Sequence, residues 1–148
     1  MVRIPPPIWM FLFLGLGWAA SIFNPWKNVG EFRIVPLGIA LVVAGVALGL
    51  VAFGLFRREG TEIRPDSEGN KKLVIAGPYR FTRNPMYLAL VIVSLGVALW
   101  AGTLPMYAVP LIVFAICNRV HIPFEEAKMR RQFGAAFDDY TKKVRRWI

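Results

Sequence analysis

The chain has 148 residues, of which 56% are hydrophobic, and its 18 basic and 9 acidic side chains give a formal net charge of +9. This apolar fraction exceeds the about 45–50% usual for a soluble domain, and the charges lie in a few segments between apolar runs, so the composition indicates one membrane-embedded domain and argues against a nucleic-acid-binding surface. One cysteine and one histidine exclude a disulfide framework within the chain and argue against a metal centre or a Ser-His-Asp triad.

The first two membrane spans are predicted over 8–23 and 34–56. No charged residue lies between Arg3 and Lys27, and the segment 8–23 is almost wholly apolar. A signal peptide with Arg3 as its basic region is the alternative, which the poor cleavage-site pattern disfavours. The segment 34–56 is free of charge and long enough to cross a hydrocarbon core of about 30 Å.

The next apolar run, 84–118, is too long for one straight crossing. As a single helix it would extend about 52 Å at 1.5 Å per residue. Gly102 and Pro105 lie near its middle and are typical helix breakers, so we predict a helical hairpin with arms 86–100 and 106–118. A single strongly tilted helix is the alternative.

The distribution of basic residues predicts which side of the membrane each segment occupies. Four crossings place Arg3, the loop 57–84 and the tail 119–148 on one side, with 16 of the 18 basic residues, and leave Lys27 and Arg33 on the other. Because basic segments favour the cytoplasmic face, we expect a multi-pass protein of a bacterial or archaeal inner membrane. Its loop, tail and active site would then face the cytoplasm.

The tail 119–148 has the pattern of an amphipathic helix that Gly134 can divide in two. Its larger apolar residues recur at steps of three and four, which places them on one helical face, and most basic residues occupy the remainder. These apolar residues are Met129, Phe133, Phe137, Tyr140, Val144 and Trp147. The expected fold is therefore an all-α integral membrane protein with about four transmembrane helices, the last two forming a hairpin, and a cytoplasmic amphipathic C-terminal helix.

Two segments at the predicted membrane boundary are candidates for a functional site. One is the stretch 77–88, where the polar loop meets an apolar span, and the other is the pair Glu125-Glu126. Both face the cytoplasm in the four-span topology, so they can converge on one pocket. Each also has a structural explanation, because Asn84 suits a helix cap and Glu126 can pair with Arg130 one turn later.

Five short motifs follow one another along residues 60–148. They are Gly77-Pro78-Tyr79-Arg80, Arg83-Asn84-Pro85-Met86-Tyr87, Glu125-Glu126, Phe133-Gly134 and Tyr140-x-x-Lys143-Val144. In this order they resemble the isoprenylcysteine carboxyl methyltransferase and phospholipid methyltransferase family, although each motif alone is weak. The resemblance implies an integral-membrane methyltransferase that uses S-adenosylmethionine as its cofactor.

The resemblance also implies roles for particular residues. The cofactor wall would consist of Gly77, Pro78, Tyr79, Asn84, Pro85, Tyr87, Glu125 and Glu126. Glu126 can bind the cofactor's ammonium group, and Arg83 or Lys143 can hold an anionic substrate head. Two positions depart from the pattern, because eukaryotic members commonly have histidine where Asn84 stands and arginine where Lys143 stands.

The expected function is methyl transfer to a lipidic or amphipathic substrate that resembles an isoprenylcysteine carboxylate or a phospholipid amine. A dry pocket favours this reaction because the donor sulfur loses its positive charge, and no metal is needed. Two alternatives are an NADPH-dependent membrane reductase of related helical architecture and a non-catalytic membrane or lipid-binding protein. The sequence leaves open whether the methyl acceptor is oxygen, nitrogen or sulfur, and which oligomer forms.

Overall fold

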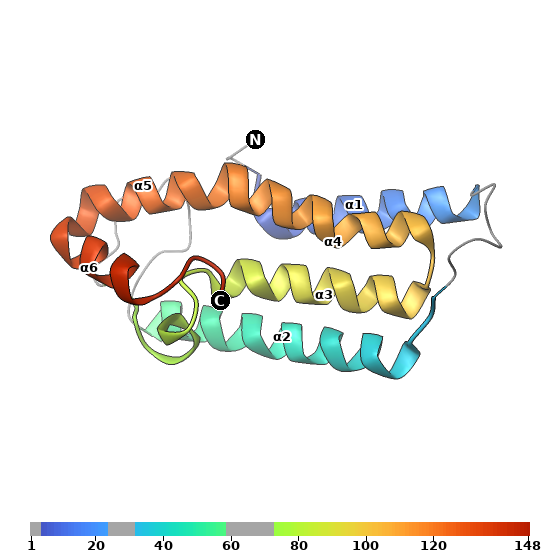
Figure 1. The fold of residues 1–148 in the computed structure, drawn as a ribbon, viewed down its shortest axis with the longest axis horizontal. Coiled ribbons are helices and arrows are strands. Elements are labelled where there is room, and N and C mark those ends of the chain that lie inside the picture. Colours follow the sequence, from blue (N-terminus) through green and yellow to red (C-terminus); the bar gives the residue numbers. More distant parts are fainter. Residues whose placement is uncertain (1–3, 24–31, 59–72) are drawn as a thin grey trace.

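The computed structural model describes residues 4–23, 32–58 and 73–148, and every regular element within them is helical (Figure 1). This confirms the prediction of an all-α protein. Arg3, Lys27 and residues 59–72 of the charged loop lie outside the described residues. The elements are α1 (Pro6–Ile22), α2 (Val35–Arg58), a 3-10 turn (Gly77–Arg80), α3 (Pro85–Ala101), α4 (Leu104–Ile116), a π-helical turn (Cys117–His121), α5 (Ile122–Phe133) and α6 (Ala135–Lys143).

Two helices of the described chain are long and apolar enough to cross a membrane. One is α2, and the other is the continuous helix Leu104–Phe133, which α4, the π-helical turn and α5 form together. The helices α1 and α3 are apolar but shorter. Large apolar side chains are exposed along these helices, and Phe11, Leu50 and Leu111 are 66%, 66% and 70% exposed. Such surfaces are suited to contact with lipid.

The helices α2 and α3 approach closely because glycines lie between them. A Cβ atom added to Gly38 would lie 2.7 Å from the carbonyl oxygen of Gly96, and one added to Gly45 would lie 2.8 Å from Cγ2 of Val93. Gly49 is less tightly packed, since a Cβ atom there would make an ordinary contact of 3.4 Å. Small residues thus bring these two backbones together, as they do in many membrane helix pairs.

A tight turn at Gly102 divides the apolar run 84–118 into the antiparallel helices α3 and α4. Gly102 has a left-handed φ of 74°, and its N–H donates to the carbonyl oxygen of Ala98 at 2.8 Å. Glycine adopts this conformation without the steric cost of a Cβ atom. The side chain of Arg33 donates from Nε to the carbonyl oxygen of Trp100 at 2.7 Å, which ties the segment before α2 to this end of the hairpin.

The tail does not continue as one amphipathic helix, so the predicted helical face is wrong beyond Lys143. Gly134, with φ of 49°, separates α5 from α6, which agrees with the break predicted there. After Lys143 the chain leaves the helix, and Val144 is extended with φ of −123° and ψ of 131°. Val144 and Trp147 therefore do not share a helical face with Phe137. The periodicity gave a wrong prediction here because it applies only to a helix, and the chain after Lys143 is not helical.

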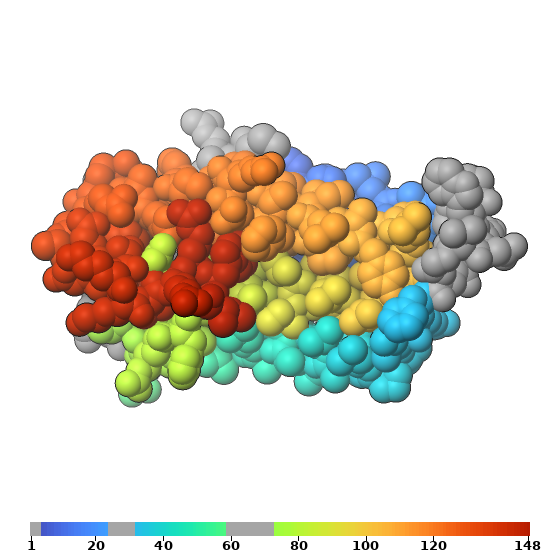
Figure 2. Space-filling model, in the orientation of Figure 1, coloured from blue at the N-terminus to red at the C-terminus, as the bar shows by residue number. Residues whose placement is uncertain are grey.

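The last residues fold back onto the start of α3. The C-terminus lies beside this helix end (Figure 1), and Figure 2 shows the C-terminal segment, in red, against both α5 and the yellow-green segment that precedes α3. The backbone N–H of Arg83 donates to the carbonyl oxygen of Arg145 at 3.0 Å. Segments far apart in the sequence therefore meet at one end of the helical bundle.

Replacing Gly38 by alanine should destabilise the protein, since the added methyl group would meet backbone atoms of α3 that cannot rotate away. We expect a loss of roughly 1–3 kcal/mol, the usual cost of overpacking, measured as a lower Tm in detergent. The matched control is Gly54→Ala on the same helix, where no atom lies within 4 Å of the added Cβ. That control should be neutral or slightly stabilising, and equal Tm values for the two variants would contradict the close contact.

Candidate functional site

A cavity of about 880 Å³ extends from a region lined by α1, α2 and α3 to a region lined by α5 and α6. Apolar side chains such as Phe11, Leu50 and Phe53 line the first region. The other region is polar, and six of the predicted site residues line the cavity there: Tyr79, Arg83, Asn84, Tyr87, Glu125 and Glu126. Four others, Gly77, Pro78, Pro85 and Lys143, are not among the lining residues.

Gly77 and Pro78 shape the turn that directs Tyr79 into the cavity. Gly77 has φ of +57°, and a Cβ atom there would lie 2.7 Å from the side chain of Leu55. Tyr79 is 4% exposed, its ring packs against Phe56, and its hydroxyl has no hydrogen-bond partner among the described residues. Burial first, and then the nearby Glu125 carboxylate, raise the pKa of Tyr79, so the phenol is neutral. A buried hydroxyl without a partner is uncommon and is suited to bind a ligand.

Asn84 immediately precedes α3, but its side chain does not cap the helix as one explanation predicted. Its Nδ2 atom instead donates to the carbonyl oxygen of Arg146 at 3.0 Å. The hydroxyl of Thr82 donates to the same carbonyl at 3.1 Å and accepts the backbone N–H of Asn84 at 3.2 Å. Asn84 and Thr82 thus fix the position of the C-terminal segment. Pro85 is buried at the first position of α3, where its missing N–H costs no helical hydrogen bond.

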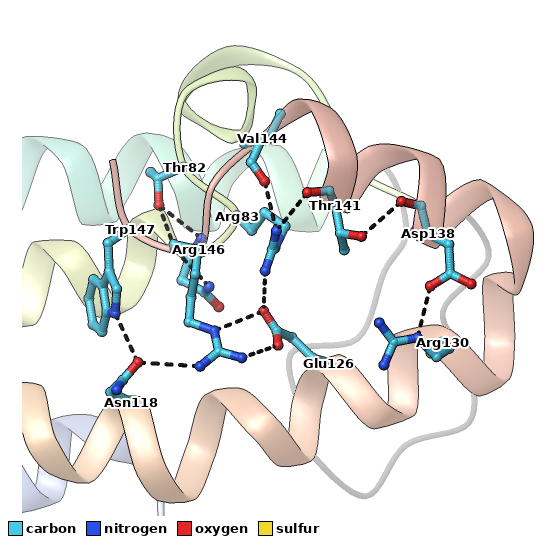
Figure 3. Close-up of polar contacts among 11 residues, drawn as sticks. Thr82, Arg83, Asn118, Glu126, Arg130, Asp138, Thr141, Val144, Arg146 and Trp147 are labelled. Atoms are coloured by element: carbon cyan, nitrogen blue, oxygen red, sulfur yellow. Dashed lines mark hydrogen bonds and ion pairs between the residues drawn. The ribbon is translucent and has the colours of Figure 1, made fainter.

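A carboxylate held by two arginines lies at the centre of the polar region (Figure 3). Arg83 Nη2 donates to Glu126 Oε1 at 2.8 Å, and Arg146 donates from Nη2 to Oε2 at 2.6 Å and from Nε to Oε1 at 3.2 Å. The side chains of Arg83 and Glu126 are only 13% and 16% exposed. Burial favours the neutral carboxyl, but the hydrogen bonds from Arg146 and Arg83 outweigh it and lower the pKa of Glu126. Glu126 is therefore ionised at neutral pH.

The sequence suggested that Glu126 pairs with Arg130, but in the structure Glu126 makes these contacts with Arg83 and Arg146 instead. Arg130 instead pairs with Asp138 of α6 at 2.8 Å, on an exposed surface. Arg83 also donates from Nη1 to the carbonyl oxygens of Thr141 and Val144, at 3.1 and 2.7 Å. Its Nε atom is buried and has no partner in the described chain.

Arg146 is a site residue that the sequence did not predict. The helical pattern puts Arg146 on the polar face of a helix, whereas the extended chain after Lys143 turns this side chain toward Glu126. Lys143 itself is exposed. Asn118 was also missed; its Oδ1 atom accepts from Trp147 Nε1 at 3.0 Å and from Arg146 Nη1 at 3.5 Å. The feature of the sequence that could have indicated this role is the adjacent basic pair Arg145-Arg146. A basic pair can contact water, but one of its members can also neutralise a buried carboxylate.

Glu125 lies on a separate side of the polar region, next to Tyr87 of α3. The Tyr87 hydroxyl donates to Glu125 Oε1 at 2.7 Å, and the carboxylate is partly buried. Burial raises the pKa of Glu125, although the hydrogen bond from Tyr87 and the positive charge of Lys128 oppose this rise. Lys128 also lines the cavity and is only 8% exposed, which its place on the predicted polar face did not indicate.

The tyrosine of α6 completes the enclosure of the polar region. The hydroxyl of Tyr140 donates to the backbone carbonyl oxygen of Tyr79 at 2.6 Å, and burial raises the pKa of Tyr140 to about 12. Within residues 4–23, 32–58 and 73–148, no group of three or more His, Cys, Asp and Glu side chains is placed to hold a metal ion. The cavity therefore offers carboxylates, guanidinium groups and neutral hydroxyls at one end, and an apolar surface at the other.

Comparison with known proteins gives consistent matches. The profile of the phospholipid methyltransferase family matches residues 33–136. A probable protein-S-isoprenylcysteine O-methyltransferase of Oryza sativa subsp. japonica is 29% identical over 110 residues, which are 73% of this chain and 57% of that protein. Methanethiol S-methyltransferase 2 of Bradyrhizobium diazoefficiens is 26% identical over 153 aligned positions, covering 95% of this chain and 49% of that protein.

The chain thus spans about half the length of these two named methyltransferases. No solved structure shows a significant match. The family profile covers the segment from the 3-10 turn through α3, and α5, which supply Tyr79, Arg83, Tyr87, Glu125 and Glu126 to the cavity. Because the profile matches well over half of the residues, the chain belongs to the phospholipid methyltransferase family.

Proposed function

We propose that this chain is an integral-membrane methyltransferase that uses S-adenosylmethionine and acts on a lipidic or amphipathic substrate. The observation that carries the proposal is one cavity with a charged, hydrogen-bonding end and an apolar end. A polar cofactor and an apolar substrate tail can share such a space. Its volume of about 880 Å³ is within the range of ligand pockets in proteins.

The cluster of Glu126 with Arg83 and Arg146 suits the methionine part of the cofactor. That part carries an ammonium group and a carboxylate, and the cluster presents a carboxylate flanked by two guanidinium groups. The buried Nε of Arg83 and the buried hydroxyl of Tyr79 lack partners among the described residues and can serve the same ligand. Bound S-adenosylmethionine supplies a methyl group on a positively charged sulfur. Backbone N–H groups near the Asn84-Pro85 helix start can also bind the cofactor's carboxylate, as a helix N-terminus does for other anions.

The role of this chain in the reaction is alignment and exclusion of water. Tyr79, Tyr87 and Tyr140 surround the polar end with neutral aromatic side chains, and Phe137 closes it from α6. Holding the acceptor and the methyl group in line lowers the entropic part of the barrier, and a dry site suits a reaction in which charge disappears. The apolar end between α1 and α2 would hold the substrate tail.

The proposed membrane arrangement follows the helices. The apolar helices α1, α2, α3 and α4 cross the bilayer, and the charged part of the last long helix, α5, extends beyond it. Residues 57–84 and 119–148 then lie on the cytoplasmic side, in the inner membrane of a bacterium or archaeon. The polar end of the cavity, which α5 and α6 supply, faces the cytoplasm and its soluble cofactor.

The alternatives fit less well. NADPH carries several phosphate groups and no ammonium group, so it would make no use of the Glu126 carboxylate between the two arginines. A non-catalytic lipid-binding protein would explain the apolar end but gives no use for the partnerless Tyr79 hydroxyl and Arg83 Nε. The named relatives are methyltransferases of two kinds, which also favours methyl transfer.

Binding of S-adenosylhomocysteine tests the cofactor assignment. The detergent-purified chain should bind S-adenosylhomocysteine in calorimetry and should not bind NADPH. Glu126→Gln should weaken this binding at least tenfold, because charged hydrogen bonds contribute about 1.5–3 kcal/mol. The control Asp139→Asn removes a carboxylate that is 64% exposed and should leave the affinity unchanged. Binding of NADPH alone, or equal affinities for wild type and Glu126→Gln, would contradict the assignment.

The stability of the folded tail should depend on pH through Glu126. Its folded-state pKa lies below the ordinary value of 4.5, so its ion pairs stabilise the folded state above that pH, and the stabilisation is lost as pH falls through the folded pKa. The Tm of the wild type should therefore decrease between neutral pH and acid more steeply than that of Glu126→Gln. Parallel Tm curves for the two proteins would contradict the arginine contacts.

A reporter fused after Ile148 tests the membrane arrangement. Because 16 of the 18 basic residues would lie on the side of the tail, we expect cytoplasmic reporter activity in a bacterial host. A reporter that is active only in the periplasm would reverse the proposed orientation.

A further inference from the structure

The glycines of α2 differ in their surroundings. Gly38 and Gly45 pack tightly against α3, because an added Cβ atom would lie only 2.7 Å and 2.8 Å from the nearest atom of that helix. An added Cβ atom on Gly49 would have one atom of the described residues within 4 Å, the Cβ atom of Ala89, at an ordinary contact distance of 3.4 Å. Close approach of the two helices therefore explains Gly38 and Gly45 but does not explain Gly49.

Glycine at position 49 also carries a cost for the helix. In a helix interior, glycine loses more backbone entropy on folding than alanine does, so alanine stabilises the helix wherever its methyl group fits. The methyl group of an alanine would fit at Gly49 without a short contact. A residue that departs from the local folding preference without a packing reason is expected where function needs the departure.

The space beside Gly49 belongs to the cavity. Gly49 and Ala89 both line it, and the lining residues of α2 run from Gly45 to Phe56, a rise of about 16 Å at 1.5 Å per residue. Gly49 precedes Phe56 by seven residues, which places it about 10 Å from Phe56 along the helix. A larger side chain at position 49 would therefore occupy the apolar part of the cavity.

The polar end of the same cavity gives a starting point for a ligand. Tyr79 packs its ring against Phe56, is 4% exposed, and has a hydroxyl without a hydrogen-bond partner in the described chain. A tail that starts at this level and follows α2 reaches Gly49 after about 10 Å. An extended chain gains about 1.2 Å per single bond, since a residue of three backbone bonds spans about 3.3–3.6 Å. The tail therefore passes Gly49 at about its ninth carbon.

We propose that Gly49 is a specificity-determining residue that selects substrates whose apolar tail is longer than about nine carbons. This inference rests on the proposed function and narrows its substrate class to long-tailed amphiphiles. Because position 49 has no side chain, the tail can pass Ala89 and contact the apolar lining residues Val46 and Val93 beyond it. Each buried CH₂ group strengthens binding about fourfold, so tail carbons beyond Gly49 add affinity that a shorter tail does not have.

Analogues of S-adenosylmethionine with a longer alkyl group test this role without knowledge of the natural acceptor. The methyl group is replaced by n-hexyl or n-dodecyl, so the chain leaves the sulfur in the direction of the acceptor. Only the dodecyl chain is long enough to pass Gly49. Affinities are measured by calorimetry on the full chain in lipid nanodiscs, and the ratio of dodecyl to hexyl affinity is compared between variants. Partition of the free analogues into lipid then cancels.

Gly49→Leu should lower this ratio at least tenfold relative to the wild type, because the leucine side chain fills the space beside Ala89. Its affinities for S-adenosylhomocysteine and for the hexyl analogue should equal those of the wild type. The matched control is Gly54→Leu, which adds the same side chain to the same helix. Gly54 does not line the cavity, and no described atom lies within 4 Å of its added Cβ, so this variant should keep the wild-type ratio.

Thermal stability separates a role in specificity from a role in packing. Gly49→Ala should have a Tm equal to or above that of the wild type, as Gly54→Ala should, because neither methyl group makes a short contact. A decrease in Tm similar to that expected for Gly38→Ala would show that Gly49 serves the contact between α2 and α3, and would contradict the inference.

The outcomes also separate this inference from the proposed function. If S-adenosylhomocysteine binds the wild type but Gly49→Leu keeps the wild-type ratio of dodecyl to hexyl affinity, Gly49 does not select the tail and the methyltransferase proposal still holds. If S-adenosylhomocysteine does not bind the wild type, both proposals are wrong. A ratio that decreases in Gly49→Leu and not in Gly54→Leu, with unchanged binding of S-adenosylhomocysteine, supports the inference.

Discussion

The ion pairs that Glu126 makes with Arg83 and Arg146 connect three segments that are distant in the sequence. Arg83 precedes α3, Glu126 belongs to α5, and Arg146 lies near the C-terminus. A buried carboxylate is stable only when its charge is compensated and its oxygens are hydrogen-bonded, and here two guanidinium groups provide both. The Glu126 carboxylate therefore holds the C-terminal segment against the end of the bundle, and Arg146 of that segment helps to neutralise the carboxylate. The polar end of the cavity depends on this contact.

The cavity results from a difference between helix pairs. The backbones of α2 and α3 approach closely at Gly38 and Gly96, which gives one rigid side. The helix α1 packs against α4 through Gly17, where an added Cβ would lie 2.9 Å from a side-chain carbon of Val109. Between these two pairs a space lined by α1 and α2 is left open, and it continues to the carboxylates of α5. In the proposed function this continuity brings a lipid-soluble tail and a water-soluble cofactor to one point.

The sequence predicted the helices better than the site. Charge-free runs and the breakers Gly102 and Gly134 have strong local causes, so the helical segments and their breaks could be expected. The motifs also identified Tyr79 and the paired glutamates among the cavity residues. The helical periodicity could not predict the path of the chain after Lys143. Donors on Thr82, Arg83 and Asn84, which precede α3, bind carbonyl oxygens of the tail and hold it extended. Lys128 was missed for a related reason: its side chain is buried against the cavity, and a helical pattern does not reveal a cavity.

The π-helical turn Cys117–His121 has a consequence for how the polar end is built. Such a turn adds one residue to an otherwise regular helix, and each residue of an α-helix advances it by about 100° around the axis. The helix α5, which begins at Ile122, is therefore rotated about the helix axis relative to α4 by about 100°. Without the added residue, the azimuth of Glu125, Glu126 and Lys128 would shift by more than a quarter turn, and their side chains would be directed away from Tyr87 and Arg83. The phase of the last helix, and not only the identity of its side chains, thus determines whether the carboxylates reach the cavity.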